Sequence, residues 1–118
     1  VAAPVALPEM LGTASVAFMP NEKRAKLLAN TVKLRFAASY RCAAVEYRAF
    51  AAGGLHFVTY FKLMPWDHLA GVLIGQEAGG YIARYDGSPY RPDHLDGGIL
   101  GAPDEESWRE LREKVFIL

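Results

Sequence analysis

Short runs of apolar, β-branched and aromatic residues alternate along this chain with longer stretches whose apolar positions recur every three or four residues. The short runs are typical of strands, and the longer stretches are typical of helices. We predict strands at 13–18, 34–39, 55–61, 81–85 and 99–102, and helices at 21–31, 42–52, 65–78 and 104–114. Residues 1–12 carry two prolines and little periodicity, and we interpret them as a connector from an upstream segment.

The run Leu55–Phe61 is the strongest strand signal and indicates a buried central strand. The final helix has a predicted buried stripe of Trp108, Leu111 and Val115. Because strands alternate with helices, we predict an α/β fold, a layered α-β-α sandwich with a mixed sheet of about five strands. The turn at Asp86-Gly87 predicts a hairpin or a return loop after the fourth strand.

Composition limits the possible functions. The chain has 118 residues, of which 52% are hydrophobic, which is enough for one core, and we assign 13–118 to one domain. Its 13 basic and 13 acidic residues cancel, which argues against nucleic-acid binding. The longest apolar stretch, Leu69–Gly75, is too short to span a membrane. The single cysteine excludes an internal disulfide and favours a reducing compartment, so we expect a cytoplasmic location.

The segment Pro65-Trp66-Asp67 places a carboxylate on the first turn of a helix that follows a buried strand. In open α/β sheets, ligands bind outside the strand ends, and the N-terminus of a helix keeps a carboxylate ionised. Asp67 is therefore a candidate ligand for a hard divalent cation. The alternative is that Asp67 only caps its helix and that Trp66 fills the core.

The residues around Asp67 form an extended pattern. Pro65-Trp66-Asp67-x-x-Ala70-Gly71 is followed by Glu77-Ala78-Gly79-Gly80. An alanine-rich helix start, Cys42-Ala43-Ala44, lies upstream, and an Asp86-Gly87-x-Pro89 turn lies downstream. The pattern resembles the C-terminal half of the inositol monophosphatase family of metal-dependent sugar phosphatases. The resemblance implies that the N-terminal half of the protein is missing from this sequence and is its main partner.

The resemblance also implies roles for individual residues. Asp67 matches a carboxylate that completes the family's magnesium site, and Arg41, Cys42 and Ala43 match the backbone that binds the substrate's phosphate and hydroxyl groups. In the family, two or three Mg²⁺ ions activate water for attack on a phosphate ester. The other metal ligands come from an upstream Glu and an Asp-Pro-x-Asp-Gly-Thr/Ser motif, neither of which occurs here. We interpret Asp93–Gly98 as a superficial likeness to that motif.

Three positions depart from the family pattern. Tyr60 stands where many members have a glutamate that binds substrate hydroxyls, so inositol specificity is unsupported. Lys62 and Arg41 replace glycines, and these two cations favour a substrate with a second anionic group, such as a bisphosphate or a nucleotide. Alternatively, Lys62 is merely solvated and Arg41 pairs with Glu46 one turn later. Cys42 is interpreted as a stand-in for serine.

We therefore expect the chain to be one half of a magnesium-dependent phosphatase that acts on a phosphate monoester of a sugar, inositol or nucleotide type. The half alone should be inactive, because one carboxylate cannot complete a magnesium site. Family members are commonly dimers, so a homodimer is expected. The alternative function is a non-catalytic binding or assembly module that pairs with itself or with a partner chain.

Overall fold

A five-stranded mixed sheet forms the centre of the computed structural model, which describes residues 1–117. The strand order is β2-β1-β3-β5-β4. β1 pairs in parallel with both β2 and β3, whereas β5 is antiparallel to β3 and β4. The strands are β1 Leu11–Ser15, β2 Phe36–Ala38, β3 Phe57–Tyr60, β4 Tyr81–Arg84 and β5 Ile99–Ala102. The predicted α/β class and mixed sheet are confirmed.

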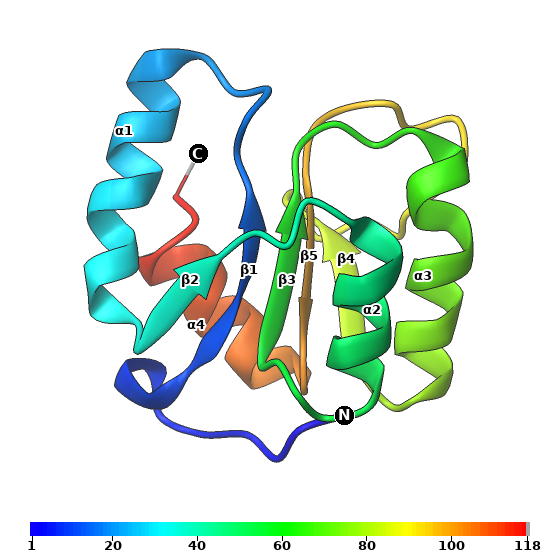
Figure 1. Cartoon of the computed structure of the whole chain (residues 1–118), viewed down its shortest axis with the longest axis horizontal. Helices are drawn as coiled ribbons and strands as arrows, with labels where there is room; N and C mark the ends of the chain where they lie inside the picture. The colour runs from blue at the N-terminus through cyan, green and yellow to red at the C-terminus, as the bar shows by residue number, and fades with distance from the viewer. Residues whose placement is uncertain (118) are drawn as a thin grey trace.

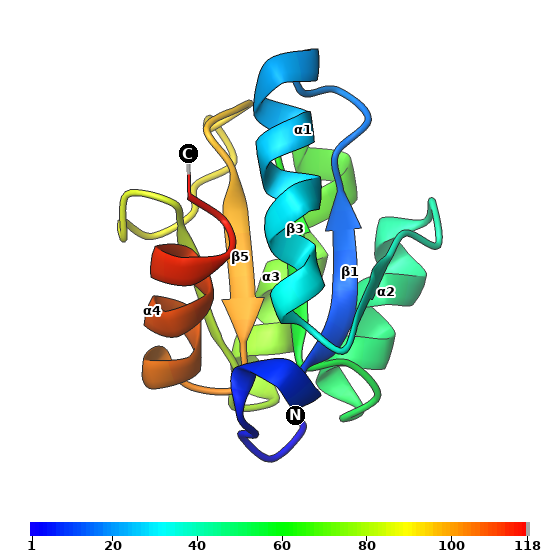
Figure 2. The same ribbon diagram turned by 90° about the vertical axis from the view of Figure 1, so that its left-hand side faces the viewer.

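Four α-helices cover the two faces of the sheet in pairs. α1 and α4 lie on one face and α2 and α3 on the other, so the three layers predicted from the sequence are present (Figure 1). Figure 2 shows α1 and α4 in front of the sheet, with α2 and α3 behind it. The helices are α1 Asn21–Asn30, α2 Ala43–Ala51, α3 Pro65–Glu77 and α4 Glu105–Lys114, with short 3₁₀ turns at Leu7–Glu9 and Thr31–Lys33.

The N-terminal segment differs from its prediction. β1 begins at Leu11, two residues before the predicted strand, and ends at Ser15. Leu7 and Met10 are buried in the core beside α1 and α4. Ordered, packed structure therefore begins before Thr13, because the 3₁₀ turn at Leu7–Glu9 directs apolar side chains inward without the periodicity of a helix or a strand.

The core has one apolar cluster on each face of the sheet. Leu27, Phe57 and Leu111 belong to the cluster beneath α1 and α4, and Tyr47 and Phe50 belong to the cluster beneath α2 and α3. The predicted stripe of α4 is confirmed, since Trp108, Leu111 and Val115 are all buried.

Helices α2 and α3 approach each other closely. A Cβ atom added to Gly71 would overlap the ring of Tyr47, so the contact requires glycine. Tyr40 lies in the loop before α2 and is about half exposed. No helix within residues 1–117 is long and apolar enough to cross a membrane.

Candidate active site

The three parallel strands β2, β1 and β3 end at the same edge of the sheet, where α2 and α3 begin. A cavity of about 940 Å³ opens there. This position, outside the carboxyl ends of parallel strands, is where α/β sheets commonly bind ligands. We call it the Asp67 cavity. All six residues selected from the sequence line it: Arg41, Cys42, Ala43, Tyr60, Lys62 and Asp67.

Asp67 lies in the first turn of α3 and is exposed to the cavity. The helix is preceded by Met64, and no side chain caps it. Among residues 1–117, the Asp67 carboxylate accepts no hydrogen bond and forms no ion pair. Trp66 is 80% exposed. The alternative that Asp67 caps the helix and Trp66 fills the core is therefore wrong, and the carboxylate is free to bind a ligand.

The loop before α2 has an unusual backbone conformation. Arg41 has φ 56°, in the left-handed region that favours glycine, at the position where the resemblance places a glycine. Cys42 precedes the helix, is exposed and caps none of its N–H groups. No side chain therefore occupies the first N–H groups of α2, which lie at the cavity and can donate hydrogen bonds to an anion.

Glu46 is buried beneath this loop and makes two hydrogen bonds. Its carboxylate accepts from the backbone N–H of Tyr40 at 2.9 Å and from the hydroxyl of Tyr60 at 3.1 Å. The predicted pairing of Glu46 with Arg41 is therefore wrong, because the carboxylate points into the protein. Burial raises the pKa of Tyr60, and the Tyr47 hydroxyl and the Glu46 carboxylate raise it further, so Tyr60 stays a neutral donor. Its hydroxyl is directed at Glu46.

His68 links the cavity wall to the β3–α3 loop. Its Nδ1 lies 2.9 Å from the hydroxyl of Tyr47, and its Nε2 lies 3.1 Å from the backbone oxygen of Lys62. Burial lowers the pKa of His68, which the nearby Asp67 carboxylate partly opposes. The neutral tautomer with hydrogen on Nε2 satisfies both contacts, donating to Lys62 and accepting from Tyr47. His68 therefore holds the backbone of Lys62 in place.

Sequence reasoning assigned no site role to Glu46, Tyr47 or His68. Partners in this network are separated by 21 residues for Tyr47 and His68 and by 14 for Glu46 and Tyr60. Only the packing of α2 against α3 and β3 brings them together. One signal was present, since Glu46 lies one turn before Phe50 and thus on the buried face of a helix.

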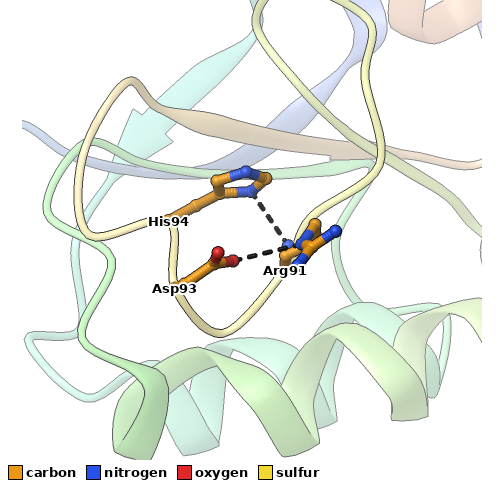
Figure 3. Close-up of polar contacts among 3 residues, drawn as sticks. All are labelled: Arg91, Asp93 and His94. Atoms are coloured by element: carbon orange, nitrogen blue, oxygen red, sulfur yellow. Dashed lines mark hydrogen bonds and ion pairs between the residues drawn. The ribbon is translucent and has the colours of Figure 1, made fainter.

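The segment Asp93–Gly98 does not contribute to the Asp67 cavity. Asp93 instead forms an ion pair with Arg91, with 3.2 Å between Oδ1 and Nε, and the backbone N–H of Arg91 donates to Nδ1 of His94 (Figure 3). These contacts stabilise a surface turn, which agrees with its interpretation as a superficial likeness. Within the part of the chain that the structure describes, no three His, Cys, Asp or Glu side chains gather in a possible metal site.

The family model "Inositol monophosphatase family" matches residues 6–116. This chain belongs to the inositol monophosphatase family. It is 37% identical over 65 residues to an inositol-1-monophosphatase of Bacillus subtilis, an alignment that covers 54% of this chain and 24% of that protein. It is 44% identical over 48 residues to the chloroplastic phosphatase IMPL1 of Arabidopsis thaliana, covering 41% of this chain and 13% of the relative.

Solved structures of inositol monophosphatases share the fold. A staphylococcal IMPase-II matches with a TM-score of 0.82 at 20% identity, covering 97% of this chain and 45% of that one. An inositol monophosphatase from Zymomonas mobilis also matches with a TM-score of 0.82, at 19% identity, covering 99% of this chain and 46% of that one. The chain thus spans less than half the length of these structures. The resemblance inferred from the sequence is confirmed.

Proposed function

We propose that this chain forms the substrate-binding half of a phosphatase that hydrolyses a phosphate monoester of a small molecule, of sugar, inositol or nucleotide type. The observation that carries the proposal is the free carboxylate of Asp67, which opens into the same cavity as the uncapped start of α2. Membership of a phosphatase family supports the reaction class. A cavity of about 940 Å³ is of the size that binds small molecules.

The residues at the start of α2 are assigned to the phosphate. Helix N-termini attract anions because their first N–H groups lack partners within the helix. The backbone of Arg41, Cys42 and Ala43 would therefore hold the phosphate oxygens, while the Arg41 side chain adds positive charge at the rim. The left-handed backbone of Arg41 and the position of this loop in the cavity lining support the assignment.

The residues of this chain do not by themselves fit a magnesium site. Mg²⁺ requires near-octahedral oxygen ligands, and Asp67 supplies one carboxylate with no second acidic side chain exposed beside it in the cavity lining. Glu46 lines the same cavity, but its carboxylate is buried and already accepts two hydrogen bonds. We therefore assign Asp67 as one ligand of a magnesium ion whose other ligands come from the N-terminal half of the protein.

Tyr60 and Lys62 bear on the choice of substrate. At this position the chain has the Tyr60 hydroxyl, which donates to Glu46, in place of a carboxylate that could accept hydrogen bonds from a polyol. Inositol is therefore not favoured over other phosphate esters. Lys62 instead places a cation beside the substrate, which favours a ligand with additional negative charge.

The test compares the 118-residue chain with the protein encoded by the complete reading frame, assayed with magnesium on sugar phosphates, bisphosphates and nucleotides. We expect turnover by the complete protein and none by the chain alone. In the complete protein, Asp67→Asn should abolish turnover, whereas Asp93→Asn, in the surface turn, should leave it unchanged. Magnesium-dependent turnover by the chain alone would refute the assignment of missing ligands.

One observation favours the second candidate, an assembly module. The outer side of α3 exposes four large apolar side chains, Trp66, Leu69, Leu73 and Ile74, of which Trp66 is 80% exposed. Such a surface is typical of an interface. If the complete protein shows no phosphatase activity and the chain forms a stable homodimer by light scattering, the assembly function replaces the catalytic one.

A further inference from the structure

A second cavity, of about 760 Å³, opens at the same edge of the sheet but toward α1 and α4. We call it the Arg112 cavity. Its lining includes the loop after β1, the first turn of α1, the connection between β4 and β5, and Arg112 of α4. Phe18 and Lys62 line both this cavity and the Asp67 cavity. The two cavities are therefore neighbours, separated by these two side chains.

Lys62 is held at this boundary. Its Nζ lies 4.5 Å from the centre of the Phe18 ring, a cation–π contact. Its backbone oxygen accepts a hydrogen bond from Nε2 of His68, which is itself buried and anchored by Tyr47. No carboxylate within residues 1–117 forms an ion pair with Lys62. The fold thus holds the Lys62 backbone at the boundary of the two cavities, and the exposed ammonium group has no anionic partner within residues 1–117.

Two further basic residues line the Arg112 cavity from different helices. Lys23 comes from the first turn of α1, and Arg112 is fixed by hydrogen bonds from its guanidinium to the backbone oxygens of Tyr85 and Phe116, each at 2.7 Å. Two acidic residues also line it, Asp86 and Asp96.

The two acidic residues do not cancel the basic ones. The carboxylate of Asp86 accepts hydrogen bonds from the N–H and the hydroxyl of Ser88, which lower its pKa, so it stays ionised and is oriented toward its own turn. Three basic side chains against two acidic ones leave the cavity basic, and the three come from separate elements of the fold. Such convergence suits an anion that accepts several charge-assisted hydrogen bonds.

We propose that the Arg112 cavity binds a second anionic group of the substrate, so that one small molecule spans both cavities across Lys62. This rests on the proposed function, which places the reacting phosphate in the Asp67 cavity. The second group binds Lys62 and Lys23, with Arg112 forming the basic wall behind it. The preferred substrate class is then a bis-anionic phosphate ester, such as a bisphosphate, rather than a simple monophosphate.

Binding to the 118-residue chain tests this without an activity assay. The probes are glucose 6-phosphate and glucose 1,6-bisphosphate, followed by backbone amide NMR. We expect both probes to shift the amides of Cys42 and Ala43 in the Asp67 cavity. Only the bisphosphate should also shift those of Gly97 and Gly98 in the Arg112 cavity, and it should bind about tenfold more tightly.

Variants assign the effect to the proposed residues. Lys62→Met keeps the apolar stem and removes the charge, and it should reduce bisphosphate affinity to near that of the monophosphate. Lys23→Ala should weaken only the bisphosphate. Lys26→Ala, an exposed lysine of the same helix that lines neither cavity, is the control and should change nothing.

The outcomes separate the two proposals. If the monophosphate shifts Cys42 and Ala43 while the bisphosphate binds no more tightly and leaves Gly97 and Gly98 unshifted, the second subsite is refuted and the proposed function stands. If neither probe shifts Cys42 and Ala43, phosphate binding in the Asp67 cavity is refuted and both proposals fall. Equal weakening of both probes by Lys62→Met would also refute the second subsite, because Lys62 would then serve the first phosphate.

Discussion

Helices α3 and α4 cover opposite faces of the same sheet, but their outer sides differ. The outer side of α4 carries ion pairs between Arg109 and Glu105 and between Lys114 and Glu110. The outer side of α3 instead exposes Leu73, Trp66 and two further large apolar residues. The outer side of α4 is thus suited to water, whereas the outer side of α3, which borders the Asp67 cavity, is suited to a covering partner. We infer that the site and the unpaired surface belong to the same side of the molecule.

The largest expected effect comes from one substitution made on both helices. Leu111→Ala on α4 empties a fully buried position and should lower the free energy of unfolding by about 2–5 kcal/mol. Leu73→Ala on α3 removes a side chain that is 58% exposed and should change it by less than about 0.5 kcal/mol in the isolated chain. Urea denaturation of both variants checks this.

The variants Leu111→Ala and Leu73→Ala can also reveal whether another surface covers α3. If Leu73→Ala destabilises the isolated chain as much as Leu111→Ala does, then α3 is already covered, for example by a second copy of the chain. Light scattering of the same samples would show whether that second copy is present, and the difference between the outer sides of the two helices would then disappear in solution.

The interior of the α3 side contains a network of buried side chains joined by hydrogen bonds, in which Glu46 is the acidic member. Tyr60→Phe removes the hydroxyl that donates to the buried Glu46 carboxylate and should cost about 1–3 kcal/mol of unfolding free energy. Tyr81→Phe, on the α4 side, is the matched control. The Tyr81 ring packs edge-on against Trp108, and its hydroxyl makes no hydrogen bond within residues 1–117, so its loss should cost far less. Equal losses for both would contradict a structural role for the Glu46 network.

Most of the fold could be predicted from the sequence because the ends of helices and the central strand carry strong local signals. Gly53-Gly54 and Gly79-Gly80 end helices α2 and α3 within a residue or two of their predicted ends, and β3 is rich in β-branched and aromatic residues. The predicted start of β1 is two residues late because Leu11 and Gly12 form no alternating pattern. Their strand character comes from pairing with β2 and β3, which a local pattern does not contain.

The site could be predicted only in part. The sequence placed Asp67 and the Arg41–Ala43 segment at helix starts, and the parallel order of the strands brings those starts to one cavity. The partner of Glu46 could not be predicted, because an arginine five residues away in the sequence is a plausible partner for any exposed glutamate. The side chain turns inward to Tyr60 instead, and that choice depends on the packing of α2 against β3.

A smaller effect is expected at the start of α2, which lacks the side-chain cap that α4 has. Asp104 caps α4 by accepting a hydrogen bond at 2.8 Å from the backbone N–H of Ser107, whereas Cys42 caps nothing. Cys42→Ser should supply the missing cap and raise the free energy of unfolding by about 1 kcal/mol, and Asp104→Ala should lower it by a similar amount. Thermal denaturation measures both. Cys42→Ala is the control, and an equal gain from it would show that capping is not the cause.

The smallest effect at neutral pH concerns His68, and it appears only on acidification. Burial lowers the pKa of His68 in the folded chain below its usual value of about 6.5. Below that pH the unfolded chain therefore binds more protons than the folded chain, and the free energy of unfolding falls as the pH is lowered. Well above a pH of about 6.5 both states hold a neutral imidazole, and His68 adds no slope.

Urea denaturation between pH 7.5 and 5 measures this slope, and His68→Gln should flatten it. His94→Gln, in the surface turn beside Arg91, is the control and should leave it unchanged. The helix of α4 contains no histidine, so a slope that vanishes with His68 must arise on the α3 side of the sheet. If the slope survives His68→Gln, the loss of stability in acid comes from other titratable groups, and the polar interior beneath α3 is not what makes the two sides respond differently to pH.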